Sequence, residues 1–505
     1  MIRDLELRTL QRVRRYAVPR TMIERCTERR LAGDWRGACA AGRIDVTFSD
    51  AQARPFQAEL DELAPDLLRW HLPRALGGRT SLATDDFYVL SLAERIEPEQ
   101  PVLAVNMPKT VDGSQRLTLE IVEDARPNLD LPPRLWSAAR LAPQRESEPW
   151  PLHEEGLVEA WRAAGVELDP QVPESRWGDE GSRLELLAAM PLNLAGLAEE
   201  ARRMTSRYGI DRVGVYLSWN LPLGLEVDSQ GRVSGAIAAE FQEVLGRRRR
   251  IGEAVARRPA DPDLLRFGLI SPGELHPLVR QALSLPDEPS TPPSRWDGVV
   301  RVRCRGEWHE IEQRAGGLVL TSHSDEEVRR ERAMRGLGGA VAGCFAVQQA
   351  WSDPPGNGKP GWLPKALRSH RRDIFQRIRH GGSEALLRLL DEGIDPRMCD
   401  GRGATLLHHL RCVDPTEVLP RLLRAGLDLE ARDCRGRTPL HVAVGDGGSP
   451  ELVRALLEAG ANLHAADLDG TTVVDLADHK RYVGYEEPDS TVQHNYQIVS
   501  EWAKR

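Results

Sequence analysis

The chain has 505 residues, enough for roughly three or four domains. Apolar residues make up 41% of it and charged residues 29%, a globular balance that excludes a disordered or fibrous chain. The formal net charge of −8 gives no overall attraction to nucleic acid or to anionic membranes, so we predict neither as a partner.

The first predicted elements are helices within residues 2–41, where apolar residues recur at helical spacing. This segment carries a charge every few residues and never supplies the apolar centre of a signal peptide, so we expect a cytoplasmic protein. Only five of the 68 basic residues are lysines, a bias typical of high-GC bacterial coding. Arginine is therefore the default cation here, which weakens functional interpretations of arginine runs.

Strand patterns follow further along the chain. Residues 101–123 contain two strand-like runs around Asp112-Gly113, a dipeptide that favours a tight hairpin turn. Similar patterns return over 212–241 and 299–324, and a helix is predicted from about residue 325 to 351. None of these segments has the β-α alternation of a doubly wound sheet. We therefore predict an α+β N-terminal region made of helices plus antiparallel hairpins.

Three stretches rich in proline, glycine and serine are predicted linkers, at residues 141–152, 284–295 and 352–364. They divide the chain into four predicted parts: an α+β N-terminal domain over 1–145, an α+β middle domain over 152–283, a hairpin-plus-helix segment over 295–351, and a repeat domain over 363–505.

From residue 365 onward, two markers recur at a fixed period. Asp400–His408 aligns with Asp433–His441 and with Asp467–Thr472, at offsets of 33 and 34 residues. The second marker is a Leu-Leu pair with a glycine three residues beyond it, which begins at Leu389, Leu422 and Leu456 and so keeps the same offsets. Two independent markers in one register predict a stack of repeated helix pairs.

At these residues the sequence resembles the ankyrin repeat family, whose signature T-P-L-H stands intact at Thr438 to His441. The resemblance implies an all-α ankyrin-type solenoid of about four repeats across 365–505. It also implies a local bond between the threonine hydroxyl and the histidine ring, for Thr405 with His408 and for Thr438 with His441.

Departures from the family pattern occur inside the stack, where Leu406 stands in place of the proline, and at the ends of the repeat domain. Val473 stands in place of the proline and Asp475 in place of the third histidine, so the last unit is predicted to be a degenerate cap whose second helix comes from 491–504. A first unit that lacks the signature is predicted over 366–393. Three upstream segments, 31–41, 67–80 and 302–311, resemble uncharacterised actinobacterial proteins that end in ankyrin repeats, and this resemblance implies no activity.

Four potential metal ligands, Cys304, His309, Glu310 and His323, lie close together in a predicted hairpin. They lack the paired short spacings of a structural zinc site, and alternate residues of a strand point to opposite faces. The seven cysteines are odd in number, scattered, and form no C-x-x-C pair. We therefore predict no metal site and no cofactor.

Two further motifs are interpreted as structural. Gly336–Gly343 suggests a phosphate-binding turn, but a charged helical segment precedes it, which favours either close helix packing or a break between two helices. Arg247–Arg250 is predicted to lie on a solvated helix, because Glu243 and Glu253 flank it and no aromatic residue is interleaved. No Walker, nucleophile-elbow or kinase motif occurs, and whether the chain is an enzyme stays open.

The ankyrin resemblance implies a protein partner. We interpret the chain as a non-enzymatic bacterial adaptor that binds this partner through its C-terminal repeats. The alternative is an effector or enzyme of unknown chemistry in residues 1–350, with the repeats recruiting its target. Because turn and cap geometry holds the Asp, Gly and Thr of each repeat, the variable turn positions are predicted to meet the partner. This finger surface comprises Arg402, Ala404, Cys434, Arg435, Arg437, Leu468, Asp469 and Thr471, and its arginines suit an acidic element on the partner.

Overall fold

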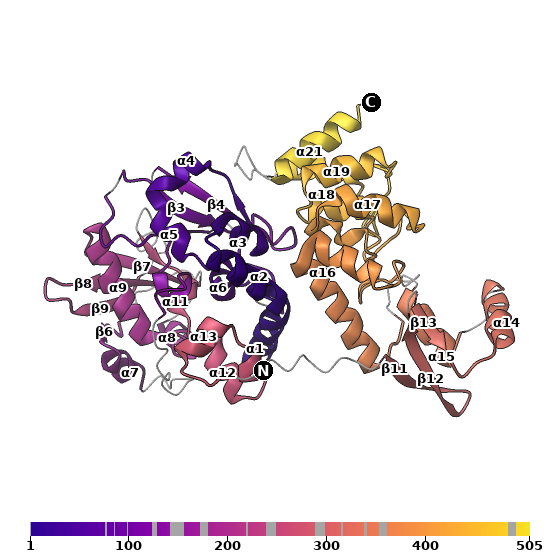
Figure 1. Cartoon of the computed structure of the whole chain (residues 1–505), viewed down its shortest axis with the longest axis horizontal. Coiled ribbons are helices and arrows are strands. Elements are labelled where there is room, and N and C mark those ends of the chain that lie inside the picture. The colour runs from indigo at the N-terminus through magenta and orange to yellow at the C-terminus, as the bar shows by residue number, and fades with distance from the viewer. Residues whose placement is uncertain are drawn as a thin grey trace. The chain divides into compact units, whose positions relative to one another are not determined.

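The computed structural model describes residues 2–504 except 76–77, 85, 98, 124–128, 142–155, 172–179, 219–220, 239–248, 288–297, 315–316, 338–340, 353–360 and 483–490. The chain divides into two compact units, one formed by 1–108 and 116–291 and the other by 109–115 and 292–505 (Figure 1). Most of each predicted linker lies outside the described residues.

The first unit opens with the helices predicted within residues 2–41: α1 (Ile2–Arg12), α2 (Arg20–Leu31) and α3 (Trp35–Ala41), with a π-helix over Val13–Ala17. Asp34 caps α3, since its carboxylate accepts the Gly37 N–H at 2.8 Å. The helices that follow are α4 (Asp50–Ala53), α5 (Gln57–Glu62) and α6 (Pro65–His71) and, later, α7 (Leu157–Ala163), α8 (Glu180–Ala189), α9 (Leu194–Tyr208), α11 (Glu253–Ala256), α12 (Ala260–Arg266) and α13 (Pro277–Ala282).

A ten-stranded sheet forms the centre of this unit, in the order β1-β4-β3-β2-β5-β10-β7-β8-β9-β6. Its strands are β1 (Ile44–Val46), β2 (Phe87–Leu90), β3 (Val102–Asn106), β4 (Leu117–Val122), β5 (Leu129–Asp130), β6 (Val166–Leu168), β7 (Arg212–Ser218), β8 (Leu221–Val227), β9 (Val233–Ile237) and β10 (Arg250–Ile251). The predicted hairpin around Asp112-Gly113 is β3 and β4, and residues 107–116 connect the two strands in place of a tight turn.

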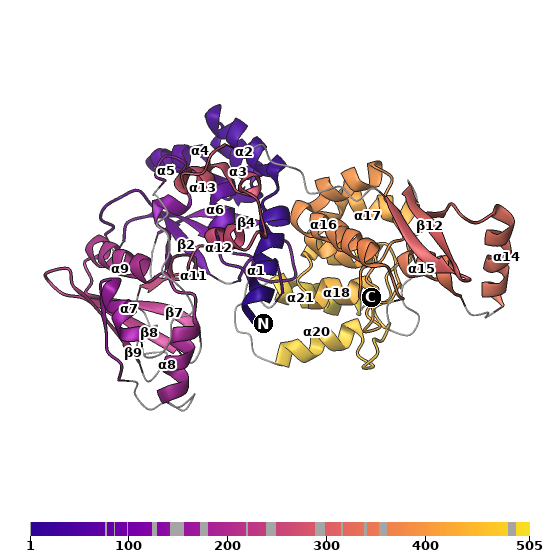
Figure 2. The ribbon, with the colours of Figure 1, turned by 90° about the horizontal axis from the view of Figure 1, so that it is seen from below.

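The two halves of the sheet repeat one topology. In the first half β2, β3 and β4 form an antiparallel meander, β1 pairs in parallel with β4, and β5 pairs in parallel with β2. In the second half β7, β8 and β9 form the meander, β6 pairs in parallel with β9, and β10 with β7. Each half has its own hydrophobic core, and both views place α7, α8 and α9 around β7–β9 (Figures 1 and 2). The two halves of the unit therefore share one strand topology.

This arrangement corrects two predictions. The α+β assignment and the antiparallel hairpins are present, but five parallel pairings occur beside them. The boundary between 145 and 152 does not separate two independent domains, because β5 pairs with β10 through Leu129 and Arg250 in one continuous sheet. Neither strand is longer than two residues, which is too short for a local sequence pattern to predict this pairing.

A buried ion cluster joins the two halves beside that pairing. Asp130 on β5 is fully buried and accepts bonds from Arg203 at 2.9 Å, Arg207 at 3.1 Å and the Tyr208 hydroxyl at 2.7 Å, all on α9. Burial alone would raise the pKa of Asp130, but the two guanidinium charges and the hydroxyl bond lower it. The carboxylate therefore stays ionised and ties the first half to a helix of the second.

The second unit begins with a three-stranded antiparallel sheet of β11 (Val299–Cys304), β12 (Glu307–Arg314) and β13 (Gly317–Leu320). Two helices follow in place of the single predicted one: α14 (Asp325–Gly336) and α15 (Gly343–Ser352). The interruption falls in the glycine run, so of the two interpretations of that run the structure has the helix break. We refer to residues 299–352 as the cap module.

The repeat domain consists of helix pairs. The first pair is α16 (Lys365–Asp391), which bends at Gly382, where φ is 65°. The later pairs are a 3-10 helix (His408–Cys412) with α17 (Pro415–Arg424), α18 (Pro439–Gly445) with α19 (Pro450–Glu458), and α20 (Val473–Tyr482) with α21 (Thr491–Trp502). The predicted all-α solenoid is thus confirmed in part, because one helix of the second pair is a single 3-10 segment.

One hydrophobic core runs from the cap module through the repeats, from Val302 to Val499. Leu422 and Leu456 of the repeat marker are fully buried, and Leu389 is half-buried against the same core. The predicted boundary between residues 351 and 363 therefore does not separate two cores. Burial of the marker leucines explains why the Leu-Leu pair recurs in each unit.

Candidate functional site

The turns between the repeats form the candidate site, and an aspartate organises each of them. Asp400 Oδ1 accepts the backbone N–H groups of the residues two and four positions on, at 2.7 and 3.0 Å. Asp433 and Asp467 make the same two bonds, at distances between 2.8 and 3.0 Å. The glycine of each turn has a positive φ between 73° and 78°, a backbone conformation that residues with a Cβ atom rarely adopt. The repeated D-x-x-G pattern is therefore turn chemistry.

Main-chain hydrogen bonds join each turn to the next. The Cys434 N–H donates to the Arg402 carbonyl at 2.7 Å, and the Leu468 N–H donates to the Arg435 carbonyl at 2.9 Å. Three successive turns are thus fixed against one another through their backbones, and the side chains that they carry are displayed at a defined spacing.

The threonine–histidine bonds implied by the ankyrin resemblance are confirmed. Thr405 Oγ1 lies 2.9 Å from His408 Nδ1, and Thr438 Oγ1 lies 2.8 Å from His441 Nδ1. Because Nδ1 also accepts the threonine N–H, Nε2 carries the proton and donates to a carbonyl of the following repeat, that of Arg437 for His408. Burial lowers the pKa of His408 to about 4, so the ring is neutral at neutral pH and can make both bonds.

The last unit replaces this histidine by Asp475, as the sequence indicates. Asp475 Oδ2 accepts both the N–H and the hydroxyl of Thr472, at 2.9 and 2.6 Å. A carboxylate can cap the helix in this way, but it has no N–H to pass on to a further repeat. Its place at the end of the stack fits the predicted degenerate cap.

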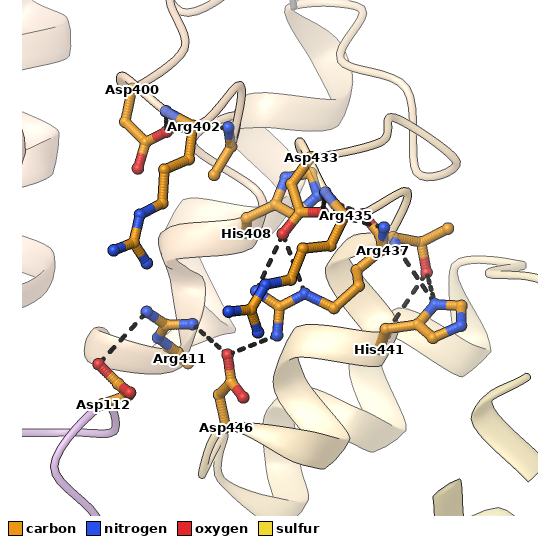
Figure 3. Close-up of polar contacts among 12 residues, drawn as sticks. Asp112, Asp400, Arg402, His408, Arg411, Asp433, Arg435, Arg437, His441 and Asp446 are labelled. Atoms are coloured by element: carbon orange, nitrogen blue, oxygen red, sulfur yellow. Dashed lines mark hydrogen bonds and ion pairs between the residues drawn. The ribbon is translucent and has the colours of Figure 1, made fainter. Parts of the chain in front are cut away.

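The finger surface is only partly available to a partner. Arg402, Arg435 and Asp469 are exposed, and Leu468 is 73% exposed. Figure 3 shows Arg402 and Arg435 extending to the same side from neighbouring turns. Ala404, Cys434 and Thr471 are half-buried, so they contribute little area to a contact.

Arg437 differs from the other two arginines, because carboxylates already bind it. Its guanidinium pairs with Asp433 at 2.9 Å and with Asp446 at 2.9 Å, and its side chain is 20% exposed. Asp446 also accepts from Arg411 at 3.1 Å (Figure 3). The prediction that Arg437 is free to meet a partner is therefore wrong. Sequence reasoning missed Asp446, which lies in the loop after α18.

Comparison with known families agrees with this geometry. Residues 374–467 match the family model described as ankyrin repeats (3 copies). No curated protein matches the chain. The family match does not extend to residues 1–373, so the actinobacterial resemblance of the upstream segments stays a prediction.

A cavity of about 150 Å³ in the first unit is the second candidate site, lined by residues of α1, α6, α11 and α12. Several of its charged groups pair with one another: Arg14 binds Asp261 at 2.7 Å, and Arg257 binds Glu6 at 2.9 Å. Burial lowers the pKa of His71 there to about 4. Among its described lining residues there is no serine, threonine or cysteine, so no hydroxyl or thiol nucleophile faces it.

The predicted solvated helix at Arg247–Arg250 is wrong where the structure describes it. Arg250 lies in strand β10, and Arg249 is buried with its guanidinium 3.7 Å above the Tyr208 ring. Arg247 and Arg248 lie outside the described residues. Within the described ranges, no helix is both long and apolar enough to span a membrane.

The structure also corrects the reasoning about the potential metal ligands. Cys304, His309 and His323 do not point to different faces but converge, together with Cys344. Glu310 does not take part, since its carboxylate binds Arg301 at 3.0 Å. Cys344 had no place in the sequence interpretation, because it lies twenty-one positions beyond His323 at the start of another helix.

Proposed function

We propose that the chain is a non-enzymatic adaptor that binds a protein partner through its ankyrin repeats, with Arg402, Arg435 and Leu468 as the contact residues. Its place in a bacterial cytoplasm is supported by the scarcity of lysine and by the charged N-terminal segment. The observation that carries the proposal is the row of three exposed side chains on turns that are joined by main-chain hydrogen bonds. A partner can bind such a row without first ordering a loop, which lowers the entropic cost of association.

The chemistry of the row indicates the kind of partner. Arg402 and Arg435 take part in no ion pair with another described residue, whereas neighbouring Arg437 is bound by two carboxylates. A guanidinium binds a carboxylate with two parallel hydrogen bonds, and arginine is frequent among residues that dominate binding energy. Leu468 adds an apolar contact on the next turn. The expected partner segment therefore carries acidic residues with an apolar side chain beside them.

The alternative is an enzyme or effector activity in residues 1–350, and the cavity of the first unit is its candidate site. Five of the acidic and basic groups that line it, Glu6, Arg14, Glu253, Arg257 and Asp261, are engaged in ion pairs with each other. Perturbed pKa values in a cleft occur in structural ion-pair networks as well as in active sites. The exposed, unpaired arginines of the repeats give stronger support to the binding function.

The test begins with a pull-down by the full chain and continues with the identified partner. The double variant Arg402→Ala with Arg435→Ala should weaken the affinity at least tenfold, or about 1.4 kcal/mol, and added salt should reduce the difference. The matched control is Arg424→Ala with Arg454→Ala, which removes two exposed arginines from the second helices of two repeats. The proposal fails if the finger variant stays folded and binds the partner as the unaltered chain does.

A further inference from the structure

Four side chains of the cap module converge on one point, and each of them could bind a metal ion. In this Cys2His2 cluster, formed by Cys304, His309, His323 and Cys344, one ligand atom from each residue lies within 4.8 Å of the other three. Cys344 is fully buried, and Cys304 and the His323 side chain are each 3% exposed. The side chain of His309 is 17% exposed. The cluster is thus shielded from solvent and contains only sulfur and imidazole nitrogen as ligand atoms.

The register of the first hairpin brings Cys304 and His309 to one face. A two-residue turn at Arg305-Gly306, both with positive φ, joins β11 to β12. His309 lies directly opposite Val302, and Val302 is two positions before Cys304. Cross-strand partners share a face, and so do residues two apart on one strand. Both ligands therefore point to the side of the sheet that faces α15.

The remaining two ligands come from the segments that follow the sheet. His323 is the third residue after the end of β13, and Cys344 is the second residue of α15. Gly343 permits this approach, because it has φ 58° and a Cβ atom there would lie 2.5 Å from the Cys304 sulfur. Both its backbone conformation and the space around it require glycine.

The orientation of the two imidazole rings matches that of metal-bound histidines. His309 Nδ1 faces His323 Nε2 at 2.9 Å, so one nitrogen of each ring points into the cluster. The outer nitrogens face carboxylates: His309 Nε2 lies 3.9 Å from Glu307, and His323 Nδ1 lies 3.7 Å from Glu327. Histidine ligands usually pair the outer N–H with a carboxylate or carbonyl, which sets the tautomer and the ring direction.

We propose that the Cys2His2 cluster binds one zinc ion in tetrahedral geometry. Two thiolates and two imidazoles are a ligand set typical of zinc. Zinc–ligand bonds of about 2.0 to 2.3 Å place neighbouring tetrahedral ligand atoms about 3.3 to 3.8 Å apart, so the present separations require shifts of roughly 1 Å or less. Four protein ligands leave no position for a substrate, which makes the site structural rather than catalytic. Each cysteine releases its thiol proton to solvent as it binds the ion.

The ion would fix the cap module to the start of the repeat stack. It would join the sheet, the segment after β13 and α15, and α15 in turn packs on α16. Trp351 stacks on the ring of His370 with centroids 6.1 Å apart, and Arg371 donates to the Ala350 carbonyl at 3.1 Å. End repeats of a solenoid need a cap, and a sheet of three short strands gains rigidity from a metal that clamps it to its helix.

Elemental mass spectrometry on the full chain, purified without an affinity tag and without added metal, tests the proposal. We expect one zinc ion per chain. The variants His309→Ala and Cys344→Ser should lose the ion, whereas the control Cys434→Ser, a half-buried cysteine outside the cluster, should retain it. Cobalt(II) added to the unaltered chain after zinc removal should give the absorption of tetrahedral thiolate-bound cobalt, and this measurement needs no variant to fold.

Three results would overturn the proposal. The first is a folded, unaltered chain that holds no zinc and gives no thiolate–cobalt absorption. The second is a disulfide between Cys304 and Cys344 in the native protein, found by peptide mapping without reduction. The third is zinc at full stoichiometry in folded His309→Ala and Cys344→Ser proteins, which would place the metal elsewhere. None of these results depends on which surface the partner binds.

Discussion

Truncation of Leu456 to alanine should destabilise the repeat stack by an amount that follows from its burial. Leu456 lies on α19 and is fully buried in the core that extends to Val499. The change removes three carbon atoms, and at about 0.8 kcal/mol per buried methylene the lost transfer free energy is about 2.4 kcal/mol. A cavity that does not collapse raises the loss towards about 5 kcal/mol. We therefore expect the free energy of unfolding of the stack to fall by roughly 2.5 to 5 kcal/mol.

Hydrogen exchange of the full chain is the suitable assay, because a chain with two compact units need not unfold in a single two-state step. Exchange in peptides that cover α18 to α21 reports the opening free energy of this part alone. The matched control is Leu468→Ala, the same chemical change at a side chain that is 73% exposed. For this control we expect a change within about 0.5 kcal/mol.

Burial of Leu456 in a packed core is refuted if the hydrogen-exchange rates in α18 to α21 are the same in Leu456→Ala and in the unaltered chain. It is also refuted if Leu468→Ala has the larger effect. Either result would mean that Leu456 does not lie in a packed core, and with it the assignment of the Leu-Leu marker to the interior of the stack would fail.

Three further predictions concern buried polar groups. The free energy of unfolding of the stack should fall on acidification, because between pH 6.5 and about 4 the unfolded chain binds a proton that folded His408 does not. The slope of the free energy is at most about 1.4 kcal/mol per pH unit. Urea unfolding of the unaltered chain and of His408→Gln across this pH range would measure that slope. His441→Ala leaves the buried N–H of Thr438 without its acceptor and should cost roughly 1 to 3 kcal/mol in thermal unfolding. Asp130→Ala leaves the Arg203 charge without that carboxylate partner and should destabilise the first unit by roughly 3 to 5 kcal/mol, measured by hydrogen exchange in β5 and α9.

The repeat domain could be predicted from the sequence because its structure is local. Each turn closes within five residues through one aspartate, and two units make a threonine–histidine bond within four residues. Such interactions leave the same residue types at the same spacing in every unit. The period of 33 and 34 residues therefore predicts both the alignment of the units and their secondary structure. The identity of a partner produces no such periodic pattern.

The large sheet could not be predicted in the same way, because its joining strands are short and pair over long sequence distances. Leu129 pairs with Arg250, and Ile44 with Leu117. A strand of two or three residues shows no alternation that differs from a loop. The individual hairpins were recognisable since their strands are longer and adjacent in sequence, but the order in which they join depends on tertiary packing.

Single residues of the finger surface show a second limit of sequence reasoning. Arg435 and Arg437 occupy the same turn, two positions apart, and nothing in their immediate neighbourhood distinguishes them. Asp446 does so, because it lies after the next helix and returns to bind Arg437 at 2.9 Å. Availability of a charged side chain is thus decided by contacts that a linear pattern does not contain.

The metal ligands illustrate how strongly such conclusions depend on strand register. Alternation along a single strand separates residues five positions apart, and on that basis Cys304 and His309 fall on opposite faces. A two-residue turn interrupts the alternation of faces between the two strands. Cys304 is the last residue of β11 and His309 is the third of β12, so both lie on one face. The glycine at position 306 marks such a turn in the sequence. In the structure its φ is 96°, and it follows the positive φ of Arg305. The same signal, applied to the hairpin before its faces are assigned, would have placed Cys304 and His309 together.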